Sequence, residues 1–149
     1  MKFVIVTAVA LFATTAQAEL ETTKKLDAAY AMFRCAELSE AGGINEKYLS
    51  SRIALRKRAF DLAFKANLGD SSTKSRDEGD WPLEVDAAYW TGWLAGQANA
   101  EVTRQFGDLP YAEVTARSNG LDSRKYKSKI KRALDAYKKE SCEALSELE

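Results

Sequence analysis

The densest chemistry in the sequence is a run of basic side chains near its C-terminal end. Six of nine consecutive positions carry Lys or Arg with no acid among them: Arg124, Lys125, Lys127, Lys129, Lys131 and Arg132. Cations in the first turns of a helix oppose its dipole, so helix stability does not account for them. At about 100° per residue they form two strips flanking Tyr126 and Ile130. Such a surface is either merely solvated or binds anions such as envelope lipid, polysaccharide or an acidic protein.

A second candidate surface combines small residues with tryptophans. The small residues recur every four positions, as on one ridge of a helix: Ala88, Gly92, Gly96 and Ala100. Each helical glycine costs up to about 1 kcal/mol relative to alanine, which indicates close packing against another helix. The alternative is a groove for a ligand or a second chain. The tryptophans nearby are Trp81, Trp90 and Trp93. The simpler expectation is that they pack in the core or cap it. The alternative is that they contact sugars or a protein partner.

The two cysteines, Cys35 and Cys142, lie far apart in the sequence. In an oxidising compartment an intramolecular disulfide is the simplest state for such a pair, with free thiols or a bridge between chains as alternatives. The bridge would close a loop of about a hundred residues and add up to about 4–5 kcal/mol in the chain-entropy model. A redox pair normally has the C-x-x-C spacing, which is absent here.

Histidine is absent from the chain, and this excludes several classes of site. A Ser-His-Asp triad, a Cys-His pair, an ordinary zinc site and an axial His for haem all need imidazole. The sequence also lacks a G-x-S-x-G elbow, a P-loop and a dinucleotide fingerprint. The acidic segment 77–80 lacks the spacing of a calcium-binding loop. We therefore expect no cofactor and no metal.

Catalysis by carboxylates alone does not require histidine, because glycosidases can use two acids about 5–9 Å apart. Acidic residues on or beside predicted helices are Glu37, Asp61, Glu84, Asp86 and Glu101. Solvated surface acids are the ordinary explanation for them, and the sequence singles out no pair. A carboxylate-dependent glycan hydrolase is therefore the alternative to a binding protein without catalytic activity.

The N-terminal segment has the pattern of a secretory signal peptide. Lys2 precedes an apolar run at 3–13, and the small residues of Ala16-Gln17-Ala18 form a cleavage site. The alternative, an uncleaved anchor, needs about 20 apolar residues to cross a membrane. No cysteine follows the site to carry a lipid. We expect cleavage after Ala18 and a periplasmic or secreted product without a transmembrane span.

Removal of 18 residues from 149 leaves residues 19–149, a length typical of one domain. Loss of Lys2 leaves 21 basic and 22 acidic residues, so the net charge of the mature chain is −1. This global balance predicts no polyanion partner, and export argues against nucleic acid as a partner.

Apolar residues recur at helical spacing in four segments, and no segment alternates as a strand does, so we expect an all-α fold. The expected helices run from Thr22 or Thr23 to Glu40, from 46 to 68 with Gly69 as terminator, from 82 to 106, and from 122 or 123 almost to 149. A short helix is expected at 110–116. The core stripe expected for the second helix includes Leu49, Ile53, Arg56, Phe60, Ala63 and Phe64.

The two cysteines also constrain helix order, because both lie near the C-terminal ends of their predicted helices. In a plain up-down-up-down bundle these ends lie apart, beyond the roughly 7 Å Cα separation of a disulfide. The bridge therefore predicts that the last helix runs parallel to the first. Residues 107–121 would then form one long crossover in a four-helix bundle-like domain.

Together these features favour an exported small helical protein that binds a partner over an enzyme. The expected partner is a protein or an anionic envelope component, contacted through the basic residues at 124–132. The second hypothetical surface consists of Gly92, Gly96, Trp90 and Trp93.

Overall fold

The computed structural model of the chain describes residues 4–42, 46–73, 81–107 and 123–147. The helices in these ranges are α1 (Val4–Ala41), α2 (Glu46–Thr73), α3 (Leu83–Phe106), α5 (Ser123–Lys139) and α6 (Cys142–Glu147). No strand occurs in these ranges, so the prediction of an all-α fold is confirmed for the described residues. The expected short helix at 110–116 lies outside them.

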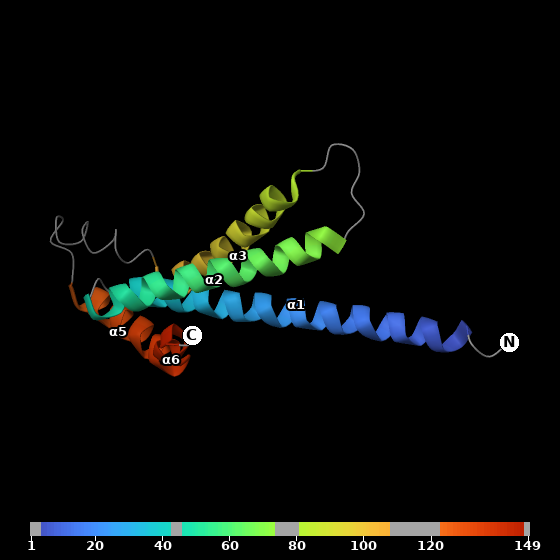
Figure 1. Cartoon of the computed structure of the whole chain (residues 1–149). Coiled ribbons are helices and arrows are strands. Elements are labelled where there is room, and N and C mark those ends of the chain that lie inside the picture. Colours follow the sequence, from blue (N-terminus) through green and yellow to red (C-terminus); the bar gives the residue numbers. More distant parts are fainter. Residues whose placement is uncertain (1–3, 43–45, 74–80, 108–122, 148–149) are drawn as a thin grey trace.

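Helix α1 is the long element on which the other helices assemble (Figure 1). Helix α2 returns antiparallel along the C-terminal part of α1, and α3 packs against both. The first turns of α3 diverge from α2 in Figure 1. Helices α5 and α6 contact α1 near its C-terminal end, and α6 also contacts α2.

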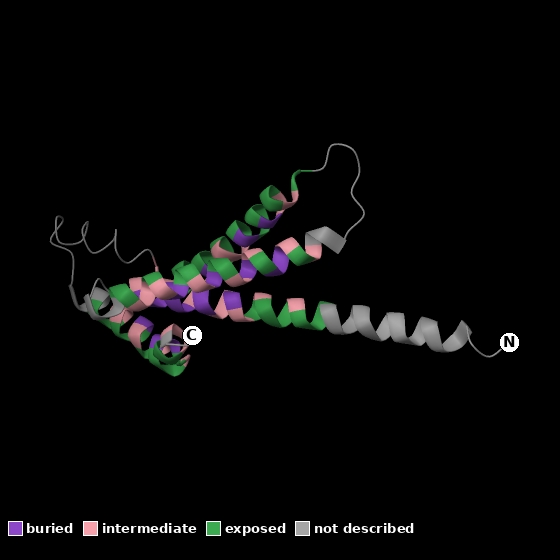
Figure 2. Cartoon of the chain, in the orientation of Figure 1, coloured by how far each residue is buried: buried purple, intermediate pink, exposed green. Residues whose placement is uncertain are grey.

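Small side chains line much of the contact between α1, α2 and α3. Alanines with no exposed surface lie on all three helices: Ala29, Ala36, Ala59, Ala63, Ala87 and Ala98. Because alanine has a short side chain, the helix axes can approach closely and larger side chains fill the spaces between them. Leu38, Leu55 and Tyr137 are the largest fully buried apolar side chains. Figure 2 shows the buried positions on the inner sides of the packed helices.

Helix α1 begins much earlier than the sequence pattern predicts. Thr22 or Thr23 was the expected start, but the helix is continuous from Val4 to Ala41. The Thr23 hydroxyl donates a 2.9 Å hydrogen bond to the carbonyl oxygen of Glu19, one turn earlier. A threonine that bonds back within a helix does not cap its N-terminus, so the predicted start is wrong.

Helix α2 differs from the prediction in its end and in its buried face. Gly69 lies inside the helix, which continues to Thr73. Ile53 and Phe60, expected in the core, are 60% and 47% exposed. Leu49 and Arg56 are exposed as well. Of the expected stripe Ala63 is fully buried, and it shares the buried stripe with Leu55, Ala59 and Ala66. Its small residues permit the close approach of α1 and α3, whereas the bulkier stripe would hold the helices apart.

The disulfide between Cys35 and Cys142 is present, with a Cα separation of 5.4 Å. Both residues are buried, with 1% and 0% of their surface exposed. The predicted intramolecular bridge is therefore confirmed.

The predicted parallel order of the first and last helices is wrong. Gly42, at the end of α1, lies against Leu134, whereas Cys35, two turns earlier on α1, bonds to Cys142. Residues later in the last helices thus contact residues earlier in α1, so α5 runs antiparallel to α1 (Figure 1). The last helix is also not continuous, because Ser141, with a φ of 54°, separates α5 from α6. The contact with α1 is short, because Leu134 of α5 lies at Gly42 and Cys142 at the start of α6 already reaches Cys35. The expected crossover at 107–121 falls almost entirely outside the described residues.

Replacement of both cysteines by alanine should lower the free energy of unfolding by about 2–5 kcal/mol, because the bridge closes a long loop. Urea unfolding followed by circular dichroism measures this loss. A reducing agent should produce a similar loss in the wild-type chain and none in the variant. Equal unfolding midpoints of the wild-type chain with and without reductant would contradict the expectation.

Gly42, at the end of α1, and Gly69, inside α2, provide a matched test of the structure. A Cβ at Gly42 would lie 2.5 Å from Leu134, whereas a Cβ at Gly69 would meet nothing within 4 Å. Gly42→Ala should therefore destabilise the protein. Gly69→Ala should stabilise it by about 0.5–1 kcal/mol, because alanine favours a helix interior. Thermal unfolding of both variants and the wild type measures these two changes in stability. Destabilisation by Gly69→Ala would argue against a continuous α2.

Candidate functional site

Helix α5 presents most of its basic side chains on the side away from the core. Ala133 and Tyr137 are buried, with Ile130 and Leu134 half-buried beside them. The exposed cations of α5, here called the basic face, are Lys127, Lys131, Arg132, Lys138 and Lys139. At about 100° per residue they share one sector of the helix opposite Ala133 and Tyr137. Exposed positions on α5 appear in Figure 2.

The charge of α5 is not neutralised by its described neighbours. The helix contains eight basic residues and one acid, Asp135, a net charge of +7. Since the whole chain has 22 basic and 22 acidic residues, the rest of it carries −7. No salt bridge joins the basic face to any residue that the structure describes, whereas Arg34, Arg52 and Arg56 each pair with a glutamate.

Three of the basic residues singled out in the sequence, Arg124, Lys125 and Lys129, are not counted in the basic face. Lys129 is half-buried, and its Nζ lies 3.2 Å from the position that a Cβ of Gly107 would occupy. Gly107 caps the C-terminus of α3 with a φ of 80°, where a cation interacts favourably with the helix dipole. Lys129 therefore lies at the C-terminal end of α3 and not on the basic face. The side-chain surroundings of Arg124 and Lys125 lie outside what the structure describes.

The tryptophans form an exposed aromatic cluster on and beside α3. Trp81, Trp90 and Trp93 are 54%, 44% and 50% exposed, and Tyr89 is 52% exposed. Edge-to-face contacts at centroid distances of 5.3–5.9 Å join neighbouring rings of the series Trp81, Tyr89, Trp90 and Trp93. The indole N–H of Trp90 donates a 3.1 Å hydrogen bond to Asp86. The expectation that these tryptophans pack in the core is therefore wrong.

The small-residue ridge beside this cluster is also exposed. Ala88, Gly92, Gly96 and Ala100 all face solvent, and a Cβ at either glycine would meet nothing within 4 Å. The expectation that another helix of the chain covers the ridge is wrong for the described residues. Helix α3 instead buries a different stripe, which contains Ala87, Thr91, Ala98, Val102 and Phe106.

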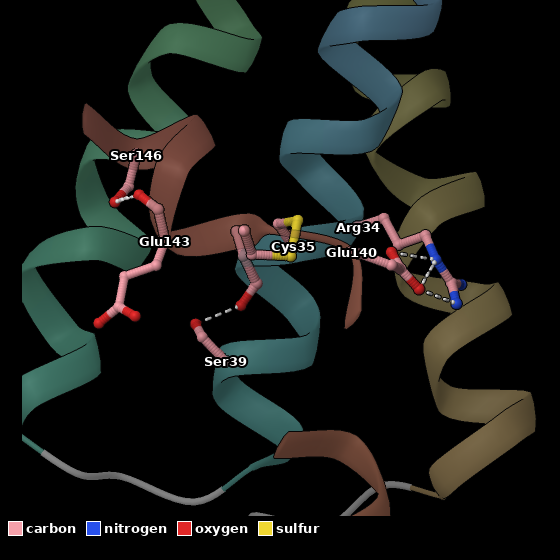
Figure 3. The surroundings of a disulfide bond; sticks show 8 residues. Arg34, Cys35, Ser39, Glu140, Glu143 and Ser146 are labelled. Atoms are coloured by element: carbon pink, nitrogen blue, oxygen red, sulfur yellow. Dashed lines mark hydrogen bonds and ion pairs between the residues drawn. A yellow bond between two sulfur atoms is a disulfide. The ribbon is translucent and has the colours of Figure 1, made fainter. Parts of the chain in front are cut away.

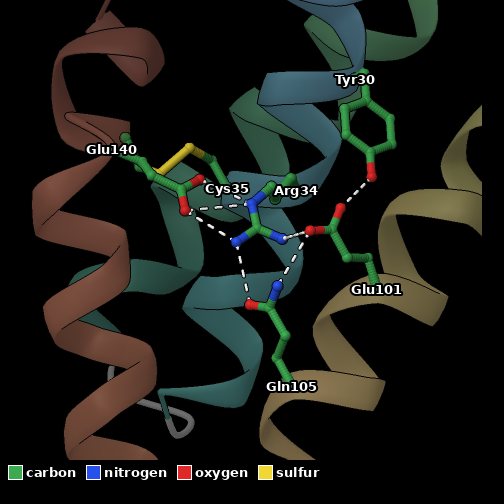
Figure 4. A network of polar contacts seen from close by, with 7 residues as sticks. Tyr30, Arg34, Cys35, Glu101, Gln105 and Glu140 are labelled. Atoms are coloured by element: carbon green, nitrogen blue, oxygen red, sulfur yellow. Dashed lines mark hydrogen bonds and ion pairs between the residues drawn. A yellow bond between two sulfur atoms is a disulfide. The ribbon is translucent and has the colours of Figure 1, made fainter.

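A polar network next to the disulfide joins three segments, and sequence reasoning missed it (Figures 3 and 4). The Arg34 guanidinium donates to Glu140 at 3.0 Å through both Nε and Nη2, and its Nη1 lies 2.9 Å from Glu101. Gln105 accepts from Nη2 and donates to Glu101, and Tyr30 donates its hydroxyl proton to Glu101. The Arg34 side chain is 15% exposed.

The electrostatics of this network indicate structure rather than catalysis. Burial opposes the charge of Arg34, but the bond to Glu140 and the charges of Glu140 and Glu101 outweigh it and raise the pKa of Arg34. The hydrogen bond to Glu101, together with burial, raises the pKa of Tyr30. Both groups therefore stay protonated at neutral pH, and each charge in the network has a partner. The arrangement links α1, α3 and the end of α5.

The candidate acids of a hydrolase are mostly engaged elsewhere. Glu37 binds Arg56 at 2.9 Å, Glu101 binds Arg34, and Asp86 accepts from Trp90. Asp61 and Glu84 are exposed. Nothing in the described part of the chain favours a pair of carboxylates acting on a glycan.

One group of potential metal ligands comes together at the disulfide. Ligand atoms of Cys35, Glu140 and Cys142 lie within 4.8 Å of one another. The two sulfurs are bonded to each other, so neither supplies the thiolate that a metal site would need. The acidic segment 77–80 lies outside the described residues.

Among the described helices, none combines the length and apolar character needed to span a membrane. Comparison of the chain with protein-family models, curated proteins and solved structures finds no match. The argument for function therefore rests on the basic face of α5 and the aromatic cluster of α3.

Tyr30→Phe should make the stability of the protein less dependent on alkaline pH. The raised pKa of Tyr30 means that the folded state holds the proton more tightly, so this contribution is lost as pH rises above the ordinary value of about 10. At pH 7–9 the free energy of unfolding of the wild type should exceed that of the variant by about 1 kcal/mol. Urea unfolding at pH 8 to 11 should show the difference shrinking; a constant difference would contradict the Tyr30–Glu101 bond.

Proposed function

We propose that the chain is an exported, bundle-like helical binding protein of the periplasm or the extracellular space, which contacts anionic envelope material through the basic face of α5. The A-x-A pattern at 16–18 supports export and cleavage after Ala18. The buried residues described on α1 begin only at Ala29. Cleavage would therefore leave the described core intact and release residues 19–149 as one domain.

The observation that carries the proposal is the uncompensated charge of α5. Like charges four residues apart, such as Lys127 and Lys131, destabilise a helix by a few tenths of a kcal/mol. No described acid offsets this repulsion with a salt bridge. An anionic surface would offset it, since each cation would gain a counter-charge on binding.

The composition of the basic face indicates how it would bind. Four of its five members are lysines, which act as point charges and do not form the bidentate contacts of arginine. The face contains no apolar side chain that could insert into a bilayer. At about 1 kcal/mol per cation near an anionic surface, five residues would supply on the order of 5 kcal/mol. The proposed contact is therefore weak, peripheral and sensitive to salt.

Charge reversal on the basic face tests the proposal. Lys127→Glu, Lys131→Glu and Arg132→Glu together should weaken binding to anionic phospholipid vesicles by at least about 100-fold, because loss of the three attractions alone costs about 3 kcal/mol and the new carboxylates also repel the surface. Vesicle co-sedimentation at low salt measures this, and high salt should release the wild-type chain.

A matched control separates a local surface from net charge. The same reversal at Lys24, Lys57 and Lys65, which are exposed on α1 and α2, changes the net charge equally. It should weaken binding much less. Equal losses in both triple variants, or no loss in the first, would contradict binding through α5. A pull-down from the native envelope fraction, repeated at high salt, would then identify the natural ligand.

A further inference from the structure

Helix α3 has a second apolar face, opposite the one it buries. The outward row contains Val85, Tyr89 and Trp93, spaced four residues apart, and all are 48–52% exposed. The same sector continues into the exposed small residues Gly96 and Ala100. These five residues are called the outer face of α3.

The apolar area on this side of α3 is large for an isolated small domain. Four aromatic side chains of roughly 200 Å² each are about half exposed, which leaves on the order of 400 Å² of aromatic surface. Tyr89 and Trp93 supply about half of it on the outer face itself, and Trp81 and Trp90 supply the rest beside it. Monomeric proteins rarely expose a contiguous apolar patch of more than a few hundred Å². A standard interface buries about 800 Å² on each partner, so this patch would form the centre of one.

The outer face is complementary in shape to itself. In an antiparallel pair of α3 helices, a twofold axis midway between positions 94 and 95 brings together residues equally distant from it. Trp93 of one copy then faces Gly96 of the other, and Tyr89 faces Ala100. Large side chains thus lie over small ones at these two levels, and Gly96 allows the two backbones to approach closely.

The charges of α3 are complementary in the same arrangement. The first turn carries Glu84 and Asp86, and the last turn carries Arg104. Antiparallel pairing brings the acidic end of each helix to the basic end of the other. Asp86 and Arg104 lie on the same flank of the outer face, so Asp86 approaches Arg104 of the second copy. Arg104 is exposed, and Asp86 is half-buried. Antiparallel helix dipoles favour the same orientation.

We propose that the outer face of α3 is the interface of a homodimer, in which a second copy packs its own α3 antiparallel across Gly92 and Gly96. The interface is isologous, so two copies close the assembly and leave no further copy of the face exposed. This proposal is independent of anion binding by α5, because it rests on another helix and on apolar contacts.

The test uses the chain expressed from its complete sequence and purified with the disulfide formed. Sedimentation velocity over a wide range of protein concentration should show a monomer–dimer equilibrium. Gly96→Leu should raise the dimer dissociation constant at least about tenfold, because the new side chain occupies the space of Trp93 from the second copy. The monomer has room for it, since a Cβ at Gly96 meets nothing within 4 Å.

Gly69→Leu is the matched control for this substitution. Gly69 is also exposed in a helix, and a Cβ there meets nothing within 4 Å. The control should leave the dissociation constant unchanged. Tryptophan fluorescence gives a second readout, because dimerisation of the wild type should shift the emission to shorter wavelength while Gly96→Leu should abolish the shift.

A charge exchange tests the antiparallel orientation. Asp86→Arg and Arg104→Asp should each raise the dissociation constant several-fold, because like charges then meet across the interface. The double variant should return it towards the wild-type value. A chain that is monomeric at all concentrations, equal effects of the two leucine variants, or no recovery in the double variant would overturn the proposal. Capture of vesicles or another protein at this face by a monomeric chain would overturn it as well.

Discussion

The covalent link between Cys35 and Cys142 is the constraint on which the arrangement of the C-terminal helices depends. Helix α5 carries a net charge of +7, and its apolar stripe is narrow, so its own sequence offers limited packing energy. The disulfide holds the following turn against α1, and the Arg34–Glu140 ion pair lies beside it (Figure 3). Because anchoring occurs at its C-terminal end and along one side, α5 can keep its cations in solvent.

Several features of the fold could be predicted from the sequence because they depend on local patterns. Helical periodicity predicted the all-α class, and Pro82 with Gly107 predicted the bounds of α3. The direction of α5 could not be predicted, because α5 contacts α1 only over its last turns, with Leu134 at Gly42 and Glu140 at Arg34, and helical periodicity does not show how far two helices overlap. The break at Ser141 was missed as well. A serine with positive φ carries no strong sequence signal, since tertiary contacts hold it in that conformation. The prediction therefore treated two helices as one.

The candidate surfaces differ in how far the sequence could reveal them. The basic face was visible because charge composition is a property of a continuous segment. The exposure of Trp93 could not be predicted from the sequence, because α3 has two apolar faces and periodicity does not show which of them packs against the core. The network around Arg34 was missed because its partners Glu101 and Glu140 come from distant segments. A basic residue between Tyr30 and Leu38, at helical spacing from both, was the one local signal.

The two proposed surfaces are compatible because they use different parts of the domain. The outer face of α3 is centred on its middle, whereas α5 approaches α3 at its C-terminal end, where Lys129 lies near Gly107. Dimerisation through α3 would therefore leave the basic face of each copy exposed. Since one face would supply only a weak, salt-sensitive contact, a dimer would gain from carrying two of them. The second contact becomes intramolecular once the first has formed, so affinity for an extended anionic surface would rise without any further charge on α5.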